Sequence, residues 1–171
     1  MRSTSVMVSQ KAVRLPPFQA LVDAHWRDVT RLARALSGPV DGDDVAQRAW
    51  EKAFAAYAGL ASARNLRGWL LTITARCATD LHRARRPQAP LYDDLPVTVD
   101  GPETLDWPDP DLWRAVAALP ERQRVAVTLK YVGDLDHHAV AAALDTTPAA
   151  SRRLVSDALA TLRTKLGVDH D

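Results

Sequence analysis

A proline-rich, acidic segment divides the chain into two parts. Residues 87–110 contain six prolines and show no helical repeat of apolar residues, which is typical of a linker rather than of a helix. Helical patterns of apolar residues lie on both sides of this segment. We therefore expect an all-α protein with an N-terminal arm over 1–17 and helical domains over 18–86 and 111–171, joined by the linker.

Charge is unevenly distributed over these parts. Residues 1–86 carry 14 Lys or Arg against 7 Asp or Glu, residues 87–111 carry 7 acids and no Lys or Arg, and residues 112–171 carry 8 against 7. The formal net charge of +1 therefore hides a basic first block. Such a block attracts polyanions, of which nucleic acid is the usual one.

The stretch from Asn65 to Arg86 is the most informative part of the basic block. At helical spacing its apolar residues form one stripe, and hydroxyl and guanidinium groups form a second. Asp80 lies where its carboxylate could orient either Arg76 or Arg83. A solvated face has the same composition, so the stretch alone leaves a binding face and a solvated face both open. The apolar stripe consists of Leu66, Trp69, Leu70, Ile73, Cys77 and Leu81, and the polar stripe of Thr72, Arg76, Thr79, Arg83 and Arg86.

Two further helices are expected before this stretch. Ser37, Gly38 and Pro39 end the first, because glycine suits a helix C-cap and proline bars continuation. Acidic residues over 41–44 begin the second, where they complement the helix dipole. Spacing alone does not show whether its outer side binds a partner or is solvated. Val45, Ala46, Ala49, Trp50, Ala53, Phe54 and Tyr57 are expected to face inward, and Asp44, Gln47, Arg48, Glu51 and Lys52 outward.

The loop over 58–65 joins this second helix to the polar stripe. Its residues are small and polar, and Arg64 and Asn65 supply hydrogen-bond donors beside Trp69. The loop could receive an unstacked base, since donors and an aromatic ring suit one. A simple connection between helices is the alternative.

The C-terminal part predicts a helix-turn-helix. Asp136 is a favourable N-cap for a short helix through Leu144, and Thr147 with Pro148 forms an N-cap and first-turn pair for a longer one. A short helix, a tight turn and a longer helix make up this motif. Residues that face outward early in the second helix would contact the major groove of DNA. They are Ala149, Arg152, Arg153 and Ser156.

Several classes of function have no support in the sequence. Cys77 is the only cysteine, which excludes disulfide frameworks and thiolate zinc sites. No phosphate-binding loop or catalytic motif is present and the histidines are scattered, so we expect no enzymatic activity, no metal and no cofactor. No apolar run reaches the ~18 residues of a membrane span. The N-terminus lacks the apolar core of a secretory signal, so we expect a cytoplasmic protein without membrane insertion.

With both parts in view, the chain resembles a bacterial sigma factor of the extracytoplasmic-function (ECF) group. Three stretches carry the resemblance: DDVAQRAWEKAF at 43–54, LRGWLLTITARCATDLHRARR at 66–86 and ALPERQRVAVTLKYVGDLDHHAVAAAL at 118–144. The third is the most specific, because LPERQR followed by an apolar helix, a glycine and a helix-turn-helix is rarely met elsewhere. Together they extend the resemblance over about 18–86 and 110–167.

The resemblance implies a role for each part of the chain. The helix over 43–54 would dock on the clamp helices of the polymerase β′ subunit through Asp44, Gln47, Arg48 and Glu51. The C-terminal domain would meet the β flap and read the −35 element, and an anti-sigma factor is a further partner that the resemblance allows. The residues implied for the melted −10 element are Arg64, Asn65, Thr72, Arg76, Thr79, Asp80, Arg83 and Arg86, and those for the −35 element are Thr147, Ala149, Arg152, Arg153 and Ser156.

Two functions are compatible with these patterns. The first is a sigma factor that binds core RNA polymerase, selects promoters and nucleates strand opening. The second is a sigma-like regulatory or interaction protein that binds polymerase or a partner without selecting promoters. The arginine pair with Asp80 favours the first. Arg48 in place of an acid, Asp145 in place of the turn glycine and Ser151 at a usually apolar position favour the second.

Overall fold

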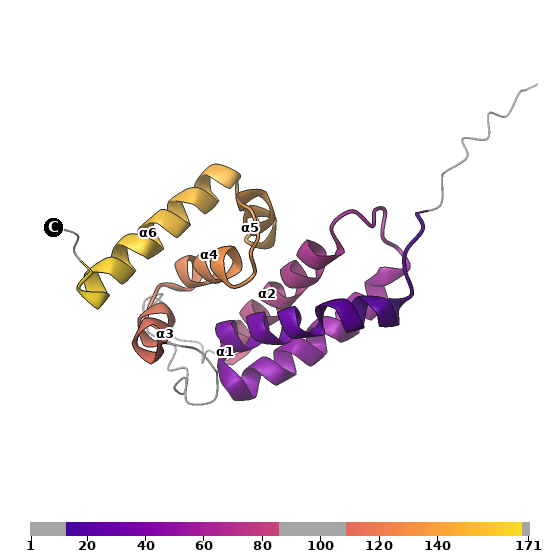
Figure 1. Cartoon of the computed structure of the whole chain (residues 1–171), viewed down its shortest axis with the longest axis horizontal. Helices are drawn as coiled ribbons and strands as arrows, with labels where there is room; N and C mark the ends of the chain where they lie inside the picture. The colour runs from indigo at the N-terminus through magenta and orange to yellow at the C-terminus, as the bar shows by residue number, and fades with distance from the viewer. Residues whose placement is uncertain (1–12, 86–108, 169–171) are drawn as a thin grey trace, which may run out of the picture.

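The computed structural model describes residues 13–85 and 109–168, which form six helices and no strand. The expected all-α class is therefore confirmed, with helices on both sides of the linker (Figure 1). Most of the arm and the linker, together with Arg86, lie outside the described residues. The helices are α1 (Phe18–Tyr57), α2 (Leu66–Arg85), α3 (Pro110–Ala117), α4 (Glu121–Tyr131), α5 (His137–Ala143) and α6 (Pro148–Leu166).

α1 is a helical hairpin that doubles back at Gly38, where the sequence predicted the end of a helix (Figure 1). Gly38 has φ 82° and ψ 175°, a conformation that essentially only glycine adopts. Beyond the turn, Gly42 lies so close to the first arm that an added Cβ would be 2.6 Å from the Arg34 Cα. Arg34 also pairs with Asp43 at 2.8 Å between Nη2 and Oδ1. The two arms of the hairpin therefore lie side by side.

An aromatic cluster holds the open end of the hairpin together. The Phe18 ring contacts Trp50, Phe54 and Tyr57, with centroids 6.0, 5.1 and 5.2 Å apart, and such edge-on pairs are favourable. The Tyr57 hydroxyl donates to the Pro16 carbonyl at 2.6 Å. The expectation that Phe54 faces inward is wrong, because 68% of this residue is exposed. Its ring touches Phe18 from outside while Ala53 takes the buried position.

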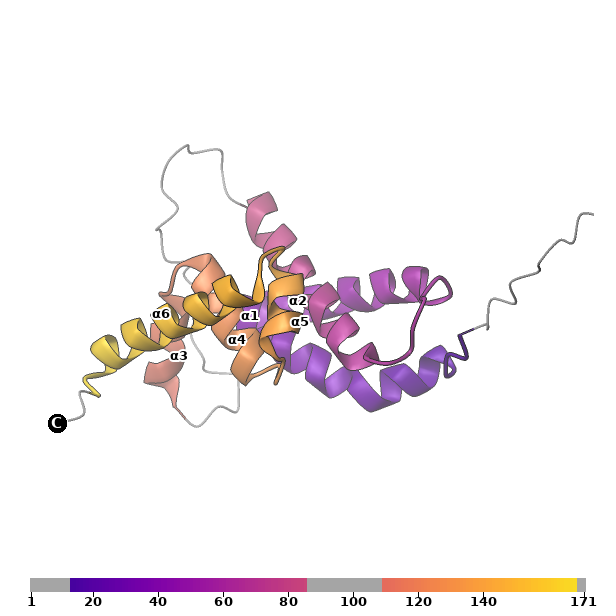
Figure 2. The same ribbon diagram turned by 90° about the horizontal axis from the view of Figure 1, so that it is seen from above.

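α2 is buried on two sides. The expected apolar stripe packs with α1, and Leu70, Cys77 and Leu81 are buried as predicted. The structure also buries Leu71 and Ala75, which the stripe did not include. Their face of α2 meets α4 and α5, so that α2 lies between the hairpin and the C-terminal helices (Figures 1 and 2).

The helices α5 and α6 begin at the N-caps that the sequence predicted. Asp136 accepts a hydrogen bond from the Ala139 amide at 2.8 Å, and Thr147 accepts one from the Ala150 amide at 3.1 Å. Asp145, which stands in place of the turn glycine, adopts a left-handed conformation with φ 50°. Ser151 is fully buried, and its hydroxyl lies 3.0 Å from Nδ1 of His137. This contact between α5 and α6 accounts for a polar residue at a core position.

The two helical units share one hydrophobic core. Leu129 of α4 and Val140 of α5 belong to the same buried cluster as Leu32 of α1 and Leu71 of α2. A smaller cluster joins α3, α4 and α6 around Ala158. The C-terminal unit thus packs on the N-terminal unit through α4 and α5, and α6 extends away from it (Figure 2).

The geometry of the hairpin turn predicts a sharp effect of replacing Gly38. A Gly38→Ala change should lower the free energy of unfolding by about 1–3 kcal/mol, because a residue with a Cβ is strained in this backbone region. Chemical denaturation followed by far-UV circular dichroism measures the change. Gly59→Ala is the matched control, because the nearest atom to its added Cβ is 3.7 Å away. Equal stability of the two variants would contradict the assignment of strain to Gly38.

Candidate nucleic-acid and polymerase interfaces

The polar stripe of α2 occupies the part of the helix circumference that neither buried face takes up. Arg83 is exposed, whereas Thr72 and Thr79 are half-buried. The Thr72 hydroxyl donates to the Gly68 carbonyl one turn earlier, at 2.9 Å. The groups of this stripe that remain best suited to bind an anion are therefore the guanidiniums.

Arg76 differs from Arg83, because the C-terminal unit already binds it. Its Nη2 donates to the Ala142 carbonyl at 2.9 Å and lies 3.3 Å from Oδ1 of Asp145. Both acceptors lie at the end of α5. No feature of the sequence pointed to this contact, because it joins residues that are 66 and 69 positions apart.

Asp80 does not take the partner that its spacing suggested. Its carboxylate pairs with Lys52 of α1 at 3.5 Å, whereas Arg76 is held by Asp145. Tertiary packing explains these partners, because α1 places Lys52 beside Asp80 and the turn after α5 places Asp145 beside Arg76. Asp80 therefore ties α2 to the hairpin through an exposed ion pair.

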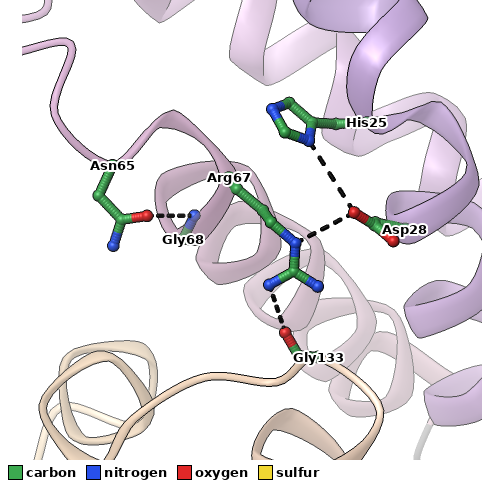
Figure 3. A network of polar contacts seen from close by, with 6 residues as sticks. All are labelled: His25, Asp28, Asn65, Arg67, Gly68 and Gly133. Atoms are coloured by element: carbon green, nitrogen blue, oxygen red, sulfur yellow. Dashed lines mark hydrogen bonds and ion pairs between the residues drawn. The ribbon is translucent and has the colours of Figure 1, made fainter.

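Asn65, in the loop before α2, has a structural role at the start of this helix. Its side-chain oxygen accepts a hydrogen bond from the Gly68 amide at 2.9 Å, which caps the start of α2 (Figure 3). An Asn cap satisfies a backbone donor that the helix itself leaves unpaired. Arg64 is exposed, and its backbone amide donates to the Ser62 hydroxyl at 3.2 Å.

A cleft of about 710 Å³ separates the polar stripe from the C-terminal unit. Arg76, Thr79, Asp80 and Arg83 form one wall of this cleft. The opposite wall comes from the start of α4 and the end of α5, and it consists of Pro120, Glu121, Arg122, Val125, Ala143, Leu144 and Asp145. Four of the residues expected to bind the −10 element therefore face α4 and the end of α5 across one cleft.

The second arm of α1 presents the residues expected to dock on polymerase. Asp44, Gln47, Arg48 and Glu51 are all exposed, and the Gln47 amide donates to the Glu51 carboxylate at 3.4 Å. Phe54 continues the same helical stripe and is exposed as well. The sequence reading assigned Phe54 to the core because of its apolar side chain, and its position one turn beyond Glu51 was the signal for the outer face.

The residues expected to contact the −35 element lie on the solvent side of α6. Thr147, Ala149, Arg152, Arg153 and Ser156 are exposed. The Thr147 hydroxyl serves as the helix cap, and Arg153 lies 3.9 Å from Asp157. Arg152 and Arg153 therefore supply the positive charge of this face.

Two titratable side chains are perturbed by their surroundings. Burial raises the pKa of the Cys77 thiol, which keeps it protonated and makes it a small apolar core residue. Burial, together with the neighbouring charges of Lys130 and Arg152, lowers the pKa of His137. Within the described residues, no cluster of three or more His, Cys, Asp or Glu could hold a metal ion.

Comparison with known protein families decides the identity of the two helical units. A model of sigma-70 region 2 matches residues 21–88, and a model of sigma-70 region 4 matches residues 110–162. The two matches follow each other along the chain and together span more than half of it. The chain belongs to the sigma-70 family. It is an RNA polymerase sigma factor with region 2 and region 4, the regions that bind core polymerase and promoter DNA, and the resemblance to a sigma factor of this family is confirmed.

Solved structures of sigma factors share this fold. One is the sigma factor RpoE from Bartonella quintana in complex with the anti-sigma factor NepR, which is 21% identical with a TM-score of 0.72 and covers 90% of this chain and 98% of that one. Another is CnrH in complex with the cytosolic domain of CnrY, which is 23% identical with a TM-score of 0.63 and covers 90% of this chain and 89% of that one. No curated protein matches the sequence. Among the described helices, none has the length and apolar composition needed to cross a membrane.

The lowered pKa of His137 predicts how the stability of region 4 depends on pH. Folding favours the neutral imidazole, so its contribution is present above the unfolded pKa of about 6.5 and is lost as pH falls through the lower folded value. Wild type should therefore lose more free energy of unfolding than His137→Gln between about pH 7.5 and about pH 5. Denaturant titrations at several pH values measure both proteins, and parallel losses would contradict this role of His137.

Proposed function

We propose that this sigma factor docks on core polymerase through the second arm of α1, opens promoters with the polar stripe of α2 and reads upstream DNA with α6. The observation that supports this best is the exposed polar and arginine-bearing character of three separate helix faces. Such a protein acts by binding and not by catalysis, in the cytoplasm where polymerase works. An anti-sigma factor is a further proposed partner, because both similar sigma factors were solved with a protein bound.

The docking surface is a single stripe on α1. Asp44, Gln47, Glu51 and Phe54 follow one another at spacings of three, four and three residues, so they share a helix face. Aromatic side chains, phenylalanine among them, are enriched at protein interfaces, and Phe54 is an exposed one on this face. Phe54 is therefore added to the residues that the sequence suggested.

Loss of Phe54 and loss of the pair Asp44 and Gln47 should each weaken docking on core polymerase. Phe54→Ala should reduce the affinity for core polymerase by about tenfold or more, because a central aromatic anchor contributes about 2 kcal/mol to such interfaces. Asp44→Ala with Gln47→Ala should also reduce it, and helical content should stay unchanged. Asp23→Ala, on the exposed side of the first arm, is the control. Undiminished capture of core polymerase by both variants would contradict the assigned surface.

The strand-binding surface rests on Arg76 and Arg83. They are two helical turns apart, so their positions lie about 10 Å from each other along the axis. That separation allows both guanidiniums to contact phosphates of one opened strand. Guanidinium is well matched to phosphate in shape and hydrogen bonding.

The double change Arg76→Ala with Arg83→Ala should abolish promoter opening and spare polymerase binding. Each lost phosphate contact should also reduce the salt dependence of binding to single-stranded DNA by about 0.7 units of slope. Permanganate footprinting of a promoter selected from a library with core polymerase measures opening. Arg163→Ala, an exposed arginine of α6, is the control. Equal reactivity of the double variant and wild type would exclude this role for the stripe.

One observation favours the alternative function of a sigma-like interaction protein. Arg76 is bound by the end of α5 and is not free to meet DNA in this arrangement. The same transcription assay separates the two functions. Initiation from any promoter of the library, together with core polymerase, supports promoter selection, whereas binding to polymerase without initiation supports the alternative.

A further inference from the structure

Asn65 lies at one end of the polar stripe of α2. It precedes Thr72 by seven residues and Arg76 by eleven, so the three side chains lie on one face of the helix. Asn65 is exposed, and its backbone carbonyl accepts a hydrogen bond from the Trp69 amide at 3.0 Å, as in a regular helical turn. A strand that follows the stripe beyond Arg76 would meet Asn65 about 16 Å further along the axis.

The side-chain oxygen of Asn65 is engaged by the helix itself. It accepts the hydrogen bond from the Gly68 amide at 2.9 Å (Figure 3). This bond fixes which end of the amide group is oxygen and which is nitrogen, because only the oxygen accepts from an N–H group. Among the described residues, none accepts a hydrogen bond from the nitrogen. The side chain therefore offers N–H donors to a ligand, while its oxygen is turned to the helix.

Gly68 makes room for this arrangement. A Cβ at this position would lie 2.4 Å from Nδ2 and 2.8 Å from Oδ1 of Asn65. A larger residue would push the amide group away from the start of α2, because the end of a side chain moves more easily than the backbone. Helices favour alanine over glycine, so the glycine has a local reason here. Gly68 is a positioning residue that acts through Asn65.

The neighbouring polar groups divide into those with partners in the chain and one further cation. The Thr72 hydroxyl donates to the Gly68 carbonyl at 2.9 Å, and the Ser62 hydroxyl accepts from the Arg64 amide at 3.2 Å. The exposed Arg64 supplies a guanidinium, which suits a phosphate. Asn65 supplies uncharged donors, which suit the edge of a base.

A side chain that only donates distinguishes two kinds of base. Guanine and thymine carry a carbonyl oxygen, O6 or O4, at the edge where adenine and cytosine carry an amino group. Such a side chain can hydrogen-bond to the keto bases, whereas it places a donor against a donor on the amino bases. An asparagine with both ends available reads adenine instead, through one donor and one acceptor. The oxygen that caps α2 therefore changes which base Asn65 suits.

We propose that Asn65 selects a keto base, guanine or thymine, in the opened strand and that Gly68 holds its amide in the donor-only orientation. This inference rests on the proposed role of the α2 stripe in holding that strand. It assigns base readout to one side chain at the start of α2 and leaves the contacts to phosphates to the arginines. Replacing either residue should change base preference more than it changes the hold on the strand.

Transcription by core polymerase from a promoter library randomised over the −10 region measures the preference. Wild type should enrich guanine or thymine at one position. Asn65→Asp keeps an oxygen for the Gly68 amide and replaces the donors with an acceptor, so the enrichment there should pass to cytosine or adenine. Asn65→Ser keeps a capping oxygen but lacks the amide group. Its preference at that position should fall by about threefold to tenfold, as expected for one lost hydrogen bond.

Gly68→Ala tests the positioning role. In the wild-type background it should weaken the same preference, because the added Cβ displaces the amide group. In the Asn65→Ser background it should leave base preference unchanged, because no amide group remains to be displaced. Asp109→Ala is the matched control for the loss of a helix cap, since Asp109 accepts from the Asp111 and Leu112 amides at 3.1 and 3.2 Å at the start of α3. It should keep the −10 preference of wild type.

The outcomes separate this inference from a purely structural role of Asn65 and from the proposed function. A preference that Asn65→Asp moves, and that Gly68→Ala weakens only in the presence of Asn65, supports the inference. If wild type selects promoters and the variants keep its base frequencies while only their free energies of unfolding change, Asn65 is a helix cap alone and the inference is overturned. Enrichment of adenine or cytosine by wild type at the affected position also overturns it. Selection of no promoter by wild type refutes the proposed function, and the inference with it.

Discussion

The structure depends on the burial of α2 between two partners. One face of this helix packs on the α1 hairpin, and another packs on α4 and α5. Burial of apolar side chains on both faces contributes the largest favourable term to folding. The polar stripe occupies the remainder of the circumference, so its position is set by the two cores. The tight turn at Gly38 is a condition of this arrangement, because it lets both arms of α1 reach α2.

Local signals in the sequence predicted most of the fold. Asp136, Thr147 and the break at Gly38 act through neighbours in the chain, so their caps and turns could be predicted. The second buried face of α2 could not be predicted in the same way, because Leu71 and Ala75 gain their partners only when region 4 packs on region 2. The partners of Asp80 and Arg76 were missed for the same reason. The spacing of charged residues along one helix carries no information about the charged side chains that pack against it from other helices.

The site residues also divide into features that the sequence predicted and features that depend on tertiary contacts. Exposure of the faces on α1, α2 and α6 agrees with the periodicity of the sequence, because a helix that buries one stripe exposes the opposite one. Phe54 was assigned to the core from its chemistry rather than from its angular position beside Gln47 and Glu51. The contact of Asp145 with Arg76 required the tertiary structure. The exposed faces of this sigma factor therefore follow from single helices, whereas the contacts between its two units follow from how the helices meet.

The small side chains on the region 4 side of α2 have a consequence for solubility. Leu71, Ala75 and Ala78 share a helix face with Arg67 and His82, which both contact region 4. Two of these three apolar residues are alanines, so the larger apolar side chains of this contact, such as Leu129 and Val140, belong to region 4. Large exposed apolar patches drive self-association, whereas small ones are tolerated in water. The surface that has to be kept from water at this contact is therefore mainly that of region 4, and less that of α2.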